Sequence, residues 1–413
     1  MAHLTPIFQK VSTKVISIRP NSTLRLLLTG LLLSLIAPFA TAEHLYNITI
    51  IPTLPGGDRN FVNDVNNHRQ VTGNSRKAGE GTRLFPYIWT PGESSPIEIG
   101  LLPNVPIFGR GFSINDSGVV VGESGNGPSK AFLWSNGDLI DLGSLPGGSG
   151  GVANAINNTG QVVGAASNGQ TVRAWISDGT PGGPLIDLGT PLGTSNSLAR
   201  AFDISNSGIV AGLARNASDT ATTPTLWIPD GNGGYTPMSI ATPAGGFGEF
   251  ESVNDAGQAV GRFSLSVDGQ SRTRALFHDG NEATELGLLA SEPTFVHSRA
   301  LGINNDELIV GYVAQFDNAP GFGGAAVIWQ DGQIVDLNTL IPHDSGWTLQ
   351  SAQGVNDHGD IVGFGLFNGQ TRAFLLTPVP EPSAFVLLGL GALGAFGYSE
   401  RRRRLKARAE EKT

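Results

Sequence analysis

Hydrophobic and polar positions along this chain follow a nine-residue pattern that occurs seven times. Each copy starts with Val or Ile, continues with Asn or Ser and then Asn or Asp, and ends on Gly. The copies span residues 65–73, 114–122, 156–164, 204–212, 253–261, 303–311 and 355–363. Their first residues lie 42 to 52 positions apart. Self-similarity at such a period is typical of a protein built from structural repeats.

Each copy predicts the corner of a β-hairpin. The β-branched residue ends one strand, Asn and Asp favour the turn, and an apolar run such as Val119–Val121 starts the next strand. A third strand carries an aromatic anchor, and a fourth follows after a turn that contains Gly, as in Leu139–Leu142. In the second repeat the anchor lies in the phrase Ala131–Trp134, which contains Phe132 and Trp134. The corresponding anchors of the other repeats are Trp89, Trp175, Trp227, Phe277, Trp329 and Phe374.

Four short strands in about 48 residues make one blade of a β-propeller. Seven copies therefore predict an all-β, seven-bladed β-propeller over residues 43–378, with an open β-solenoid as the alternative. The last copy ends after its third strand, residues 372–377, and has no fourth. Residues 46–51 form an unassigned strand, and the Leu-Pro-Gly-Gly that follows at 54–57 matches the one at 145–148. We expect this N-terminal strand to complete the last blade and close the ring.

Residues 1–42 have the composition of an export signal. Four basic residues and no acidic one precede or border the apolar run 26–37, and the small residues Ala40 and Ala42 follow it. A basic region, an apolar core and a small-x-small site are the parts of a secretory signal peptide. We expect cleavage after Ala42; an uncleaved membrane anchor is the alternative, although the core is short for a span.

Residues 379–413 form a second signal in three parts. The motif 379–383 contains Val379, Pro380, Glu381 and Pro382, the apolar stretch 384–398 predicts a hydrophobic helix, and the basic tail 400–413 includes Arg401, Arg402, Arg403 and Arg404. The arginines favour the cytoplasmic side of a membrane. A simple tail anchor is the alternative function for this segment.

This tail resembles the PEP-CTERM sorting signal of Gram-negative bacteria that make exopolysaccharide. The resemblance implies that an exosortase-type enzyme recognises Pro380, Glu381 and Pro382 and processes the exported protein. It also implies that the hydrophobic helix holds the chain in the membrane, at least transiently. The expected location is the cell envelope, cell surface or extracellular matrix.

The repeats themselves resemble the extracellular HAF repeat. The phrases that carry this resemblance are Lys130–Trp134 and Asp141–Leu145. The His-Ala-Phe triplet of that family has Lys130 in place of His in the second repeat and Arg372 in the seventh. The resemblance implies an extracellular repeat protein and brings no established reaction with it.

Charge and cysteine content narrow the possible functions. The two ends hold 11 of the 26 basic and four of the 35 acidic residues, which leaves 15 basic against 31 acidic residues in the body, a net charge of −16. Such a charge opposes nucleic-acid binding, which depends on Lys and Arg. The absence of cysteine excludes disulfides, zinc-thiolate sites and cysteine nucleophiles.

Two columns of acidic residues are candidates for chemistry. The first lies at the hairpin corner, at Asp116, Asp255 and Asp357, where the other repeats have Asn; turn formation is the favoured role and calcium binding a weak alternative. The second lies on the fourth strand, where an outward, solvated charge at the rim is favoured over a catalytic one. Its members are Glu98, Asp141, Asp187, Glu285 and Asp336.

No catalytic, cofactor or metal residue can be nominated. The seven histidines lack zinc spacing and are expected in loops or at the surface, and no phosphate-binding loop is present. We therefore expect a non-catalytic surface or matrix module that binds exopolysaccharide or another envelope component through loops such as 217–223 and 315–324. A propeller glycosidase or lyase is the rival, and it predicts carboxylate, His or Tyr side chains facing the central channel.

Overall fold

The computed structural model describes residues 45–380, apart from 104, 106, 126–127, 194–196, 216–220 and 318–323. The predicted signal peptide, with Ala40 and Ala42, lies outside the described residues. So do the hydrophobic helix predicted at 384–398 and the arginines Arg401–Arg404.

The described residues form seven four-stranded antiparallel sheets. Blade 1 consists of β2 (Asn60–Val65), β3 (Val71–Ser75), β4 (Phe85–Trp89) and β5 (Ile97–Glu98). Blade 2 consists of β6 (Gly109–Ile114), β7 (Val120–Ser124), β8 (Lys130–Ser135) and β9 (Asp138–Asp141). Blade 3 consists of β10 (Gly151–Ile156), β11 (Val162–Ser167), β12 (Val172–Ser177) and β13 (Ile186–Asp187). Blade 4 consists of β14 (Ala199–Ile204), β15 (Val210–Arg215), β16 (Thr222–Pro229) and β17 (Tyr235–Ser239).

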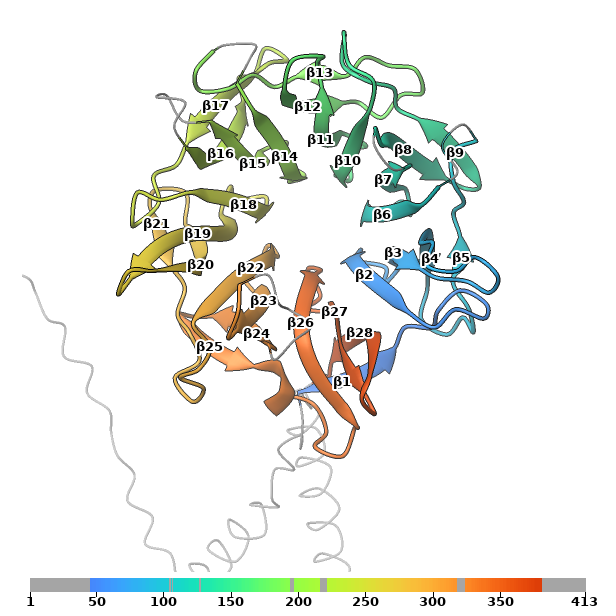
Figure 1. Cartoon of the computed structure of the whole chain (residues 1–413), viewed down its shortest axis with the longest axis vertical. Helices are drawn as coiled ribbons and strands as arrows, with labels where there is room; N and C mark the ends of the chain where they lie inside the picture. The colour runs from blue at the N-terminus through green and yellow to red at the C-terminus, as the bar shows by residue number, and fades with distance from the viewer. Residues whose placement is uncertain are drawn as a thin grey trace, which may run out of the picture. The chain divides into compact units, whose positions relative to one another are not determined.

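The remaining blades follow the same order. Blade 5 consists of β18 (Gly248–Val253), β19 (Ala259–Val267), β20 (Gln270–His278) and β21 (Ala283–Glu285). Blade 6 consists of β22 (His297–Ile303), β23 (Ile309–Ala314), β24 (Gly324–Gln330) and β25 (Gln333–Asp336), followed by the 3-10 helix η1 (Leu337–Thr339). Blade 7 consists of β26 (Trp347–Val355), β27 (Ile361–Phe367), β28 (Gln370–Pro378) and β1 (Tyr46–Ile50). The first strand of each blade lies nearest the centre of the ring (Figure 1).

The ring closes as the sequence predicts. Strand β1 pairs with β28 in the register Tyr46↔Pro378 to Ile50↔Phe374, so the N-terminal strand is the outer strand of blade 7. At the inner edge, the side-chain nitrogen of Asn356 donates to the main-chain oxygen of Asn66, 2.9 Å away, and joins blade 7 to blade 1. The seven-bladed propeller is confirmed and the open solenoid is wrong.

The Gly that ends each sequence copy has a steric cause. In all seven blades a β-bulge interrupts the pairing of the first two strands, two residues before the copy begins. The bulge pushes a first-strand carbonyl against the Gly of the second strand. A Cβ on Gly122 would lie 1.9 Å from the oxygen of Arg110, and the other six glycines meet equivalent oxygens at 1.9 to 2.1 Å. No other residue fits this position.

Buried aromatic and aliphatic side chains fill the spaces between blades, as expected, but the predicted anchors do not share one register. Trp175 and Phe374 lie opposite the Gly that ends the sequence copy of their blade, whereas Trp227 lies two residues further along the third strand, opposite Val210. The assumption of one anchor position was therefore wrong. Alternate residues of a strand share a face, so an aromatic ring at either position can fill the same gap. Trp134 and Phe277 are only partly buried.

Candidate functional site

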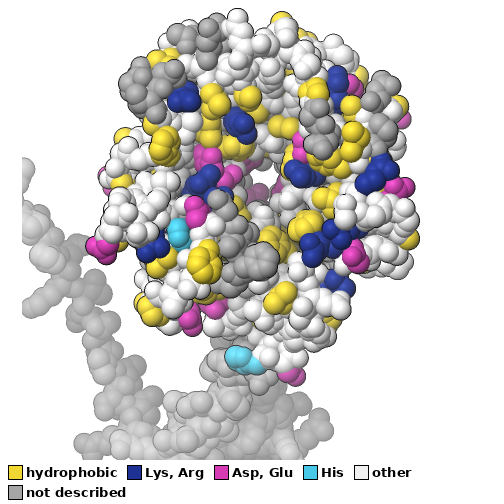
Figure 2. Space-filling view, viewed as in Figure 1, with side chains coloured by type: hydrophobic (Ala, Val, Ile, Leu, Met, Phe, Trp, Pro, Cys, Tyr) yellow, Lys and Arg dark blue, Asp and Glu magenta, His cyan; other side chains and the backbone are white. Residues whose placement is uncertain are grey.

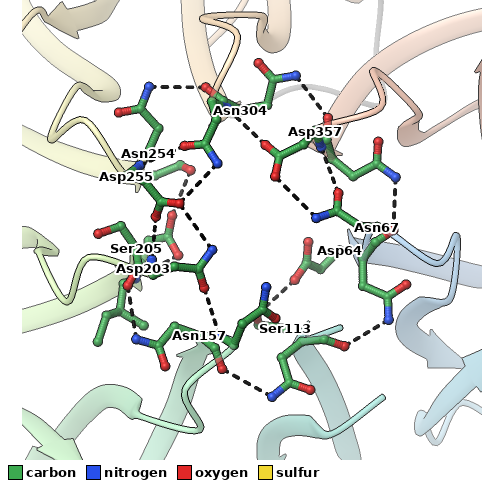
Figure 3. Close-up of a pocket in the computed structure, with 18 of the residues that line it drawn as sticks. Asp64, Asn67, Ser113, Asn157, Asp203, Ser205, Asn254, Asp255, Asn304 and Asp357 are labelled. Carbon is green, nitrogen blue, oxygen red and sulfur yellow. Dashed lines mark hydrogen bonds between the residues drawn. The ribbon is translucent and has the colours of Figure 1, made fainter. Parts of the chain in front are cut away.

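The hairpin corners of all seven blades meet at one end of the central channel and form a closed ring of hydrogen bonds (Figure 3). The third residue of each copy donates its main-chain N–H to the side-chain oxygen of its counterpart in the next blade, at 2.6 to 3.1 Å. We call these residues the corner ring: Asn67, Asp116, Asn158, Asn206, Asp255, Asn305 and Asp357.

Asp and Asn are distributed around the corner ring so that no two carboxylates are neighbours. The three Asp are the largest number that seven positions can hold without placing two side by side. Each carboxylate accepts from neighbouring amides: Asn158 donates its side-chain N–H to Asp116 at 2.7 Å, and Asn305 donates to Asp255 at 3.2 Å. These carboxylates therefore stabilise the closed ring by joining neighbouring blades. The sequence analysis predicted only a role in the turn of their own blade and missed this contact.

The preceding residue of each copy forms the predicted turn and a second bridge. The side-chain oxygen of Asn115 accepts the N–H groups of Ser117 and Val119, and its side-chain nitrogen donates to the oxygen of Asn157 in the next blade, at 3.2 Å. Six blades make this bridge. Blade 4 has Ser205 instead of Asn, and no such bond from it to Asn254 is found among the described residues.

Two partly buried carboxylates lie one layer deeper in the channel. Asp64 accepts from the hydroxyl of Ser113 at 2.9 Å and from the N–H of Ile114 at 3.0 Å, both in the next blade. Asp203 makes the equivalent bonds to Ser252 and Val253. Burial raises the pKa of Asp64 to about 6, although these hydrogen bonds favour the ionised form. These carboxylates also hold neighbouring blades together.

The bulge residues form the next layer of the channel wall. A cavity of about 130 Å³ lies among them. We call them the bulge layer: Asn63, Phe112, Asn154, Phe202, Glu251, Leu301 and Gln353. Asn63 and Asn154 donate to main-chain oxygens of the next blade, at 2.6 and 2.7 Å. Two residues before the bulge layer, nearer the other opening, lies the mouth layer: Phe61, Arg110, Val152, Arg200, Glu249, Arg299 and Ser351.

A pair of carboxyl groups lies on the inner strand of blade 5. Burial and then the charge of Glu249 raise the pKa of Glu251 to about 7, whereas Arg299 and Arg262 act in the opposite direction. The two glutamates lie two residues apart on β18, and Glu249 pairs with Arg262 at 2.6 Å. The channel therefore contains carboxyl side chains as well as Ser, Gly and apolar residues. A channel lined by Ser, Gly and apolar residues alone would have excluded a propeller enzyme.

The acidic column of the fourth strand lies at the rim, as predicted. Glu98 pairs with Lys77 at 2.8 Å, Asp187 with Arg173 at 2.8 Å, and Glu285 with Arg274 at 2.9 Å. Asp141 lies 3.5 Å from Lys130. Asp336 instead caps η1 by accepting from the N–H of Asn338. A cation from the same blade therefore neutralises most of this column.

Metal and histidine sites are not assembled in the described part of the chain. It contains no group of three or more His, Asp or Glu side chains that could hold a metal ion, and this includes the corner positions for which calcium was the alternative. The expectation that all histidines are surface or loop residues was wrong for His278 and His297, which are buried in β20 and β22. Successive side chains of a strand point to opposite faces of the sheet, and in a propeller both faces pack against neighbouring blades, so residues of these strands can be buried.

Two residues of the sorting motif are visible. Val379 and Pro380 follow β28 directly, the N–H of Val379 donates to the oxygen of Leu45 at 2.8 Å, and Pro380 is exposed. Glu381 and Pro382 lie outside the described residues. The two ends of the body thus leave the same blade. Among residues 45–380, as far as they are described, no helix is long and apolar enough to cross a membrane.

The predicted loops 217–223 and 315–324 connect the second and third strands of blades 4 and 6, at the opening opposite the corner ring. Residues 217–220 and 318–323 of these loops lie outside the described residues. The pairs that begin and end the loops are described: Arg215 pairs with Thr222, and Ala314 pairs with Gly324.

Comparison with known families gives two matches. A model described as PEP-CTERM protein-sorting motif matches residues 378–403, and one described as protein of unknown function (DUF3466) matches residues 190–374. The sorting motif marks the chain as an exported, envelope-targeted protein that an exosortase-type enzyme processes. Since the repeats match DUF3466, the resemblance to the HAF repeat stays a prediction.

No curated protein is significantly similar to the chain. Solved propellers are similar at low identity. The β-propeller domain of the Trilobed protease from Pyrococcus furiosus is 12% identical, with 78% of this chain and 94% of that chain covered and a TM-score of 0.48. TolB from Acinetobacter baumannii is 11% identical, with 75% and 63% covered and a TM-score of 0.41. A gluconolactonase from Xanthomonas campestris is 12% identical, with 64% and 83% covered and a TM-score of 0.33.

Proposed function

We propose that this exported propeller is a non-catalytic module that binds the exopolysaccharide of its own Gram-negative cell, or another envelope component. The observation that carries the proposal is the use of the channel carboxylates. Asp64 and Asp203 hold adjacent blades, and the carboxylates of the corner ring hold neighbouring amides. Carboxylates that join adjacent blades in this way make the scaffold rigid. Ligand binding is then expected at the open face of the propeller and at its loops.

The rival function is a glycosidase or lyase, and the Glu249–Glu251 pair favours it. Carboxyl groups with raised pKa values often mark catalytic sites. However, glycosidases hold two carboxyl groups about 5–10 Å apart, with the scissile bond between them. Glu249 and Glu251 lie two residues apart on one strand, and Glu249 is already paired with Arg262. We therefore favour binding over hydrolysis.

One experiment separates the two functions. The body, residues 43–378, is titrated with exopolysaccharide from the source cells while released sugars are measured in the same samples. Its described buried clusters draw only on residues 46 to 376, so we expect it to fold alone. Saturable binding without release supports the proposal. Release that disappears in the Glu251→Gln variant would establish the rival, and absence of both would refute the polysaccharide ligand.

The sorting step has its own test in the source cells. Glu381→Ala should leave the C-terminal tail attached, because the Pro-Glu-Pro motif is the proposed recognition element of the exosortase-type enzyme. Ser383→Ala is a matched control just outside that motif. Unchanged processing of the Glu381→Ala protein, followed by mass spectrometry of the C-terminus, would contradict this role.

A further inference from the structure

The mouth layer of the channel departs from the sevenfold repeat in a regular way. Blades 2, 4 and 6 each place an arginine there: Arg110, Arg200 and Arg299. All three occupy one register position, opposite the residue that follows the conserved Gly of the second strand. Three arginines therefore start from equivalent backbone positions on alternate blades around one opening.

The bulge layer, which lies beneath the mouth layer, also differs between the blades that carry arginine and the other blades. Under the three arginines the bulge layer is apolar, with Phe112, Phe202 and Leu301, whereas the other four blades contribute amide or carboxyl side chains. Apolar walls with a few convergent polar groups are typical of small-ligand sites. The opening thus combines cationic groups at the rim with apolar side chains beneath them.

This concentration of arginines opposes the charge of the body, which is −16. Figure 2 shows Lys and Arg side chains gathered around the central opening, with acidic side chains beside some of them. Five of the body's 15 basic residues belong to the two innermost strands of their blades: Arg110, Arg200, Arg215, Arg262 and Arg299. Arg110, Arg262 and Arg299 are paired with Glu123, Glu249 and Asp317. Arg200 has no acidic partner among the described residues, so its charge is available to an anionic group that approaches this face.

Two of the three arginines are accessible. Arg200 is exposed and forms no ion pair with any residue that the structure describes. Arg110 pairs with Glu123 at 3.1 Å and lies 5.0 Å from the ring centre of Phe108, yet 45% of its side chain is exposed. Arg299 is less exposed and lies 3.6 Å from Asp317. Arg110 and Arg200 can therefore contact a ligand without a change in the fold.

Arginine presents a planar fork of N–H donors that matches a carboxylate with two parallel hydrogen bonds. We infer that this mouth binds the carboxylate of an acidic sugar, with Arg110 and Arg200 as its ligands and Phe112 and Phe202 beneath the sugar ring. The inference deepens the proposed function and rests on it. It adds the class of polysaccharide, one that contains uronic acids, and the face of the propeller that binds it.

The test uses the body, residues 43–378, and three probes: polygalacturonate, neutral dextran and dextran sulfate. We expect saturable binding of polygalacturonate that weakens with added salt, and at least tenfold weaker binding by Arg110→Gln/Arg200→Gln. The matched control is Lys77→Gln/Lys130→Gln, which removes the same charge from pairs at the rim. Arg200→Gln alone, which breaks no described ion pair, should weaken binding without lowering the melting temperature.

Each other outcome contradicts the inference. Equal losses in the arginine and lysine variants would mean that binding reports only net charge. Binding of dextran sulfate alone would replace the carboxylate by a sulfate. If the source polysaccharide binds the wild type and both arginine variants equally, the proposed function stands and this site falls. If neither the source polysaccharide nor polygalacturonate binds, both fall.

Discussion

The two ends of the channel are built from the same seven strands but differ in what their side chains do. At the corner end, all seven blades contribute Asn or Asp at one position, and their hydrogen bonds join each blade to the next. At the other end, the same strands carry residues as different as Arg110, Val152 and Glu249.

This difference separates architecture from candidate function. A group that recurs in every blade satisfies a requirement that every blade shares, such as ring closure or the close approach at Gly122. A residue that occurs in only some of the blades is not needed for a structural feature that all blades share. The alternation of arginines on blades 2, 4 and 6 is such a departure, and two of the three, Arg110 and Arg200, are exposed.

The largest expected effect sharpens the architectural half of the comparison. Gly122→Ala should destabilise the body by about 3 kcal/mol or more, because its Cβ would lie 1.9 Å from the oxygen of Arg110. Gly287→Ala is the control, since nothing lies within 4 Å of a Cβ there. Denaturant unfolding of both variants measures the difference, and similar midpoints would contradict the steric role of the repeated Gly.

The next effect is a pH dependence of stability. The folded-state pKa is about 6 for Asp64 and about 7 for Glu251, both raised above their ordinary values by burial. The folded state therefore holds more protons than the unfolded state between about pH 4 and 7, and stability falls as pH rises through this range. We expect the melting temperature to be a few degrees higher at pH 5 than at pH 8.

Glu251→Gln tests the cause of this dependence. The amide carries no charge at any pH, so burial and the charge of Glu249 no longer disfavour this side chain above pH 7. The variant should therefore melt higher than the wild type at pH 8 and depend less on pH. Glu282→Gln, at an exposed turn, is the control. An unchanged pH profile in the Glu251 variant would assign the effect to other groups.

A smaller gain is expected at the corner, where blade 4 lacks a bridge. Ser205→Asn should supply the missing donor to the main-chain oxygen of Asn254 and stabilise the body by about 1 kcal/mol. For a body of this size the melting temperature should rise by roughly 2 °C. Ser207→Asn, two residues along the same turn, is the control, and a decrease for Ser205→Asn would show that the bridge is not transferable.

The smallest effect concerns the order of charges in the corner ring. Asn158→Asp would place a carboxylate beside Asp116 and remove the donor that now bonds to it. We expect a loss of up to about 1 kcal/mol at pH 7 that shrinks in high salt and below pH 4. Asn158→Ser, which removes the amide without adding charge, separates the two causes. Equal losses at all pH values would exclude carboxylate repulsion.

The fold was predictable because the repeat encodes it locally. The corner phrase shows the hairpin, its recurrence shows the blades, and the unassigned strand at 46–51 shows the closure. The corner ring was not predictable from turn chemistry, because Asn67 and Asp116 lie 49 residues apart and meet only when neighbouring blades pack together. The alternating arginines were visible in the sequence four residues before each copy, but only an alignment of the repeats beyond the nine-residue phrase would have shown them.

The most direct test of the division between the two ends compares Arg200→Gln and Ser205→Asn in one experiment. Each body is melted alone and then titrated with the source polysaccharide. The division predicts that Arg200→Gln loses binding at an unchanged melting temperature, whereas Ser205→Asn melts higher and binds as the wild type does. Normal binding by Arg200→Gln, or loss of binding by Ser205→Asn, would contradict the account.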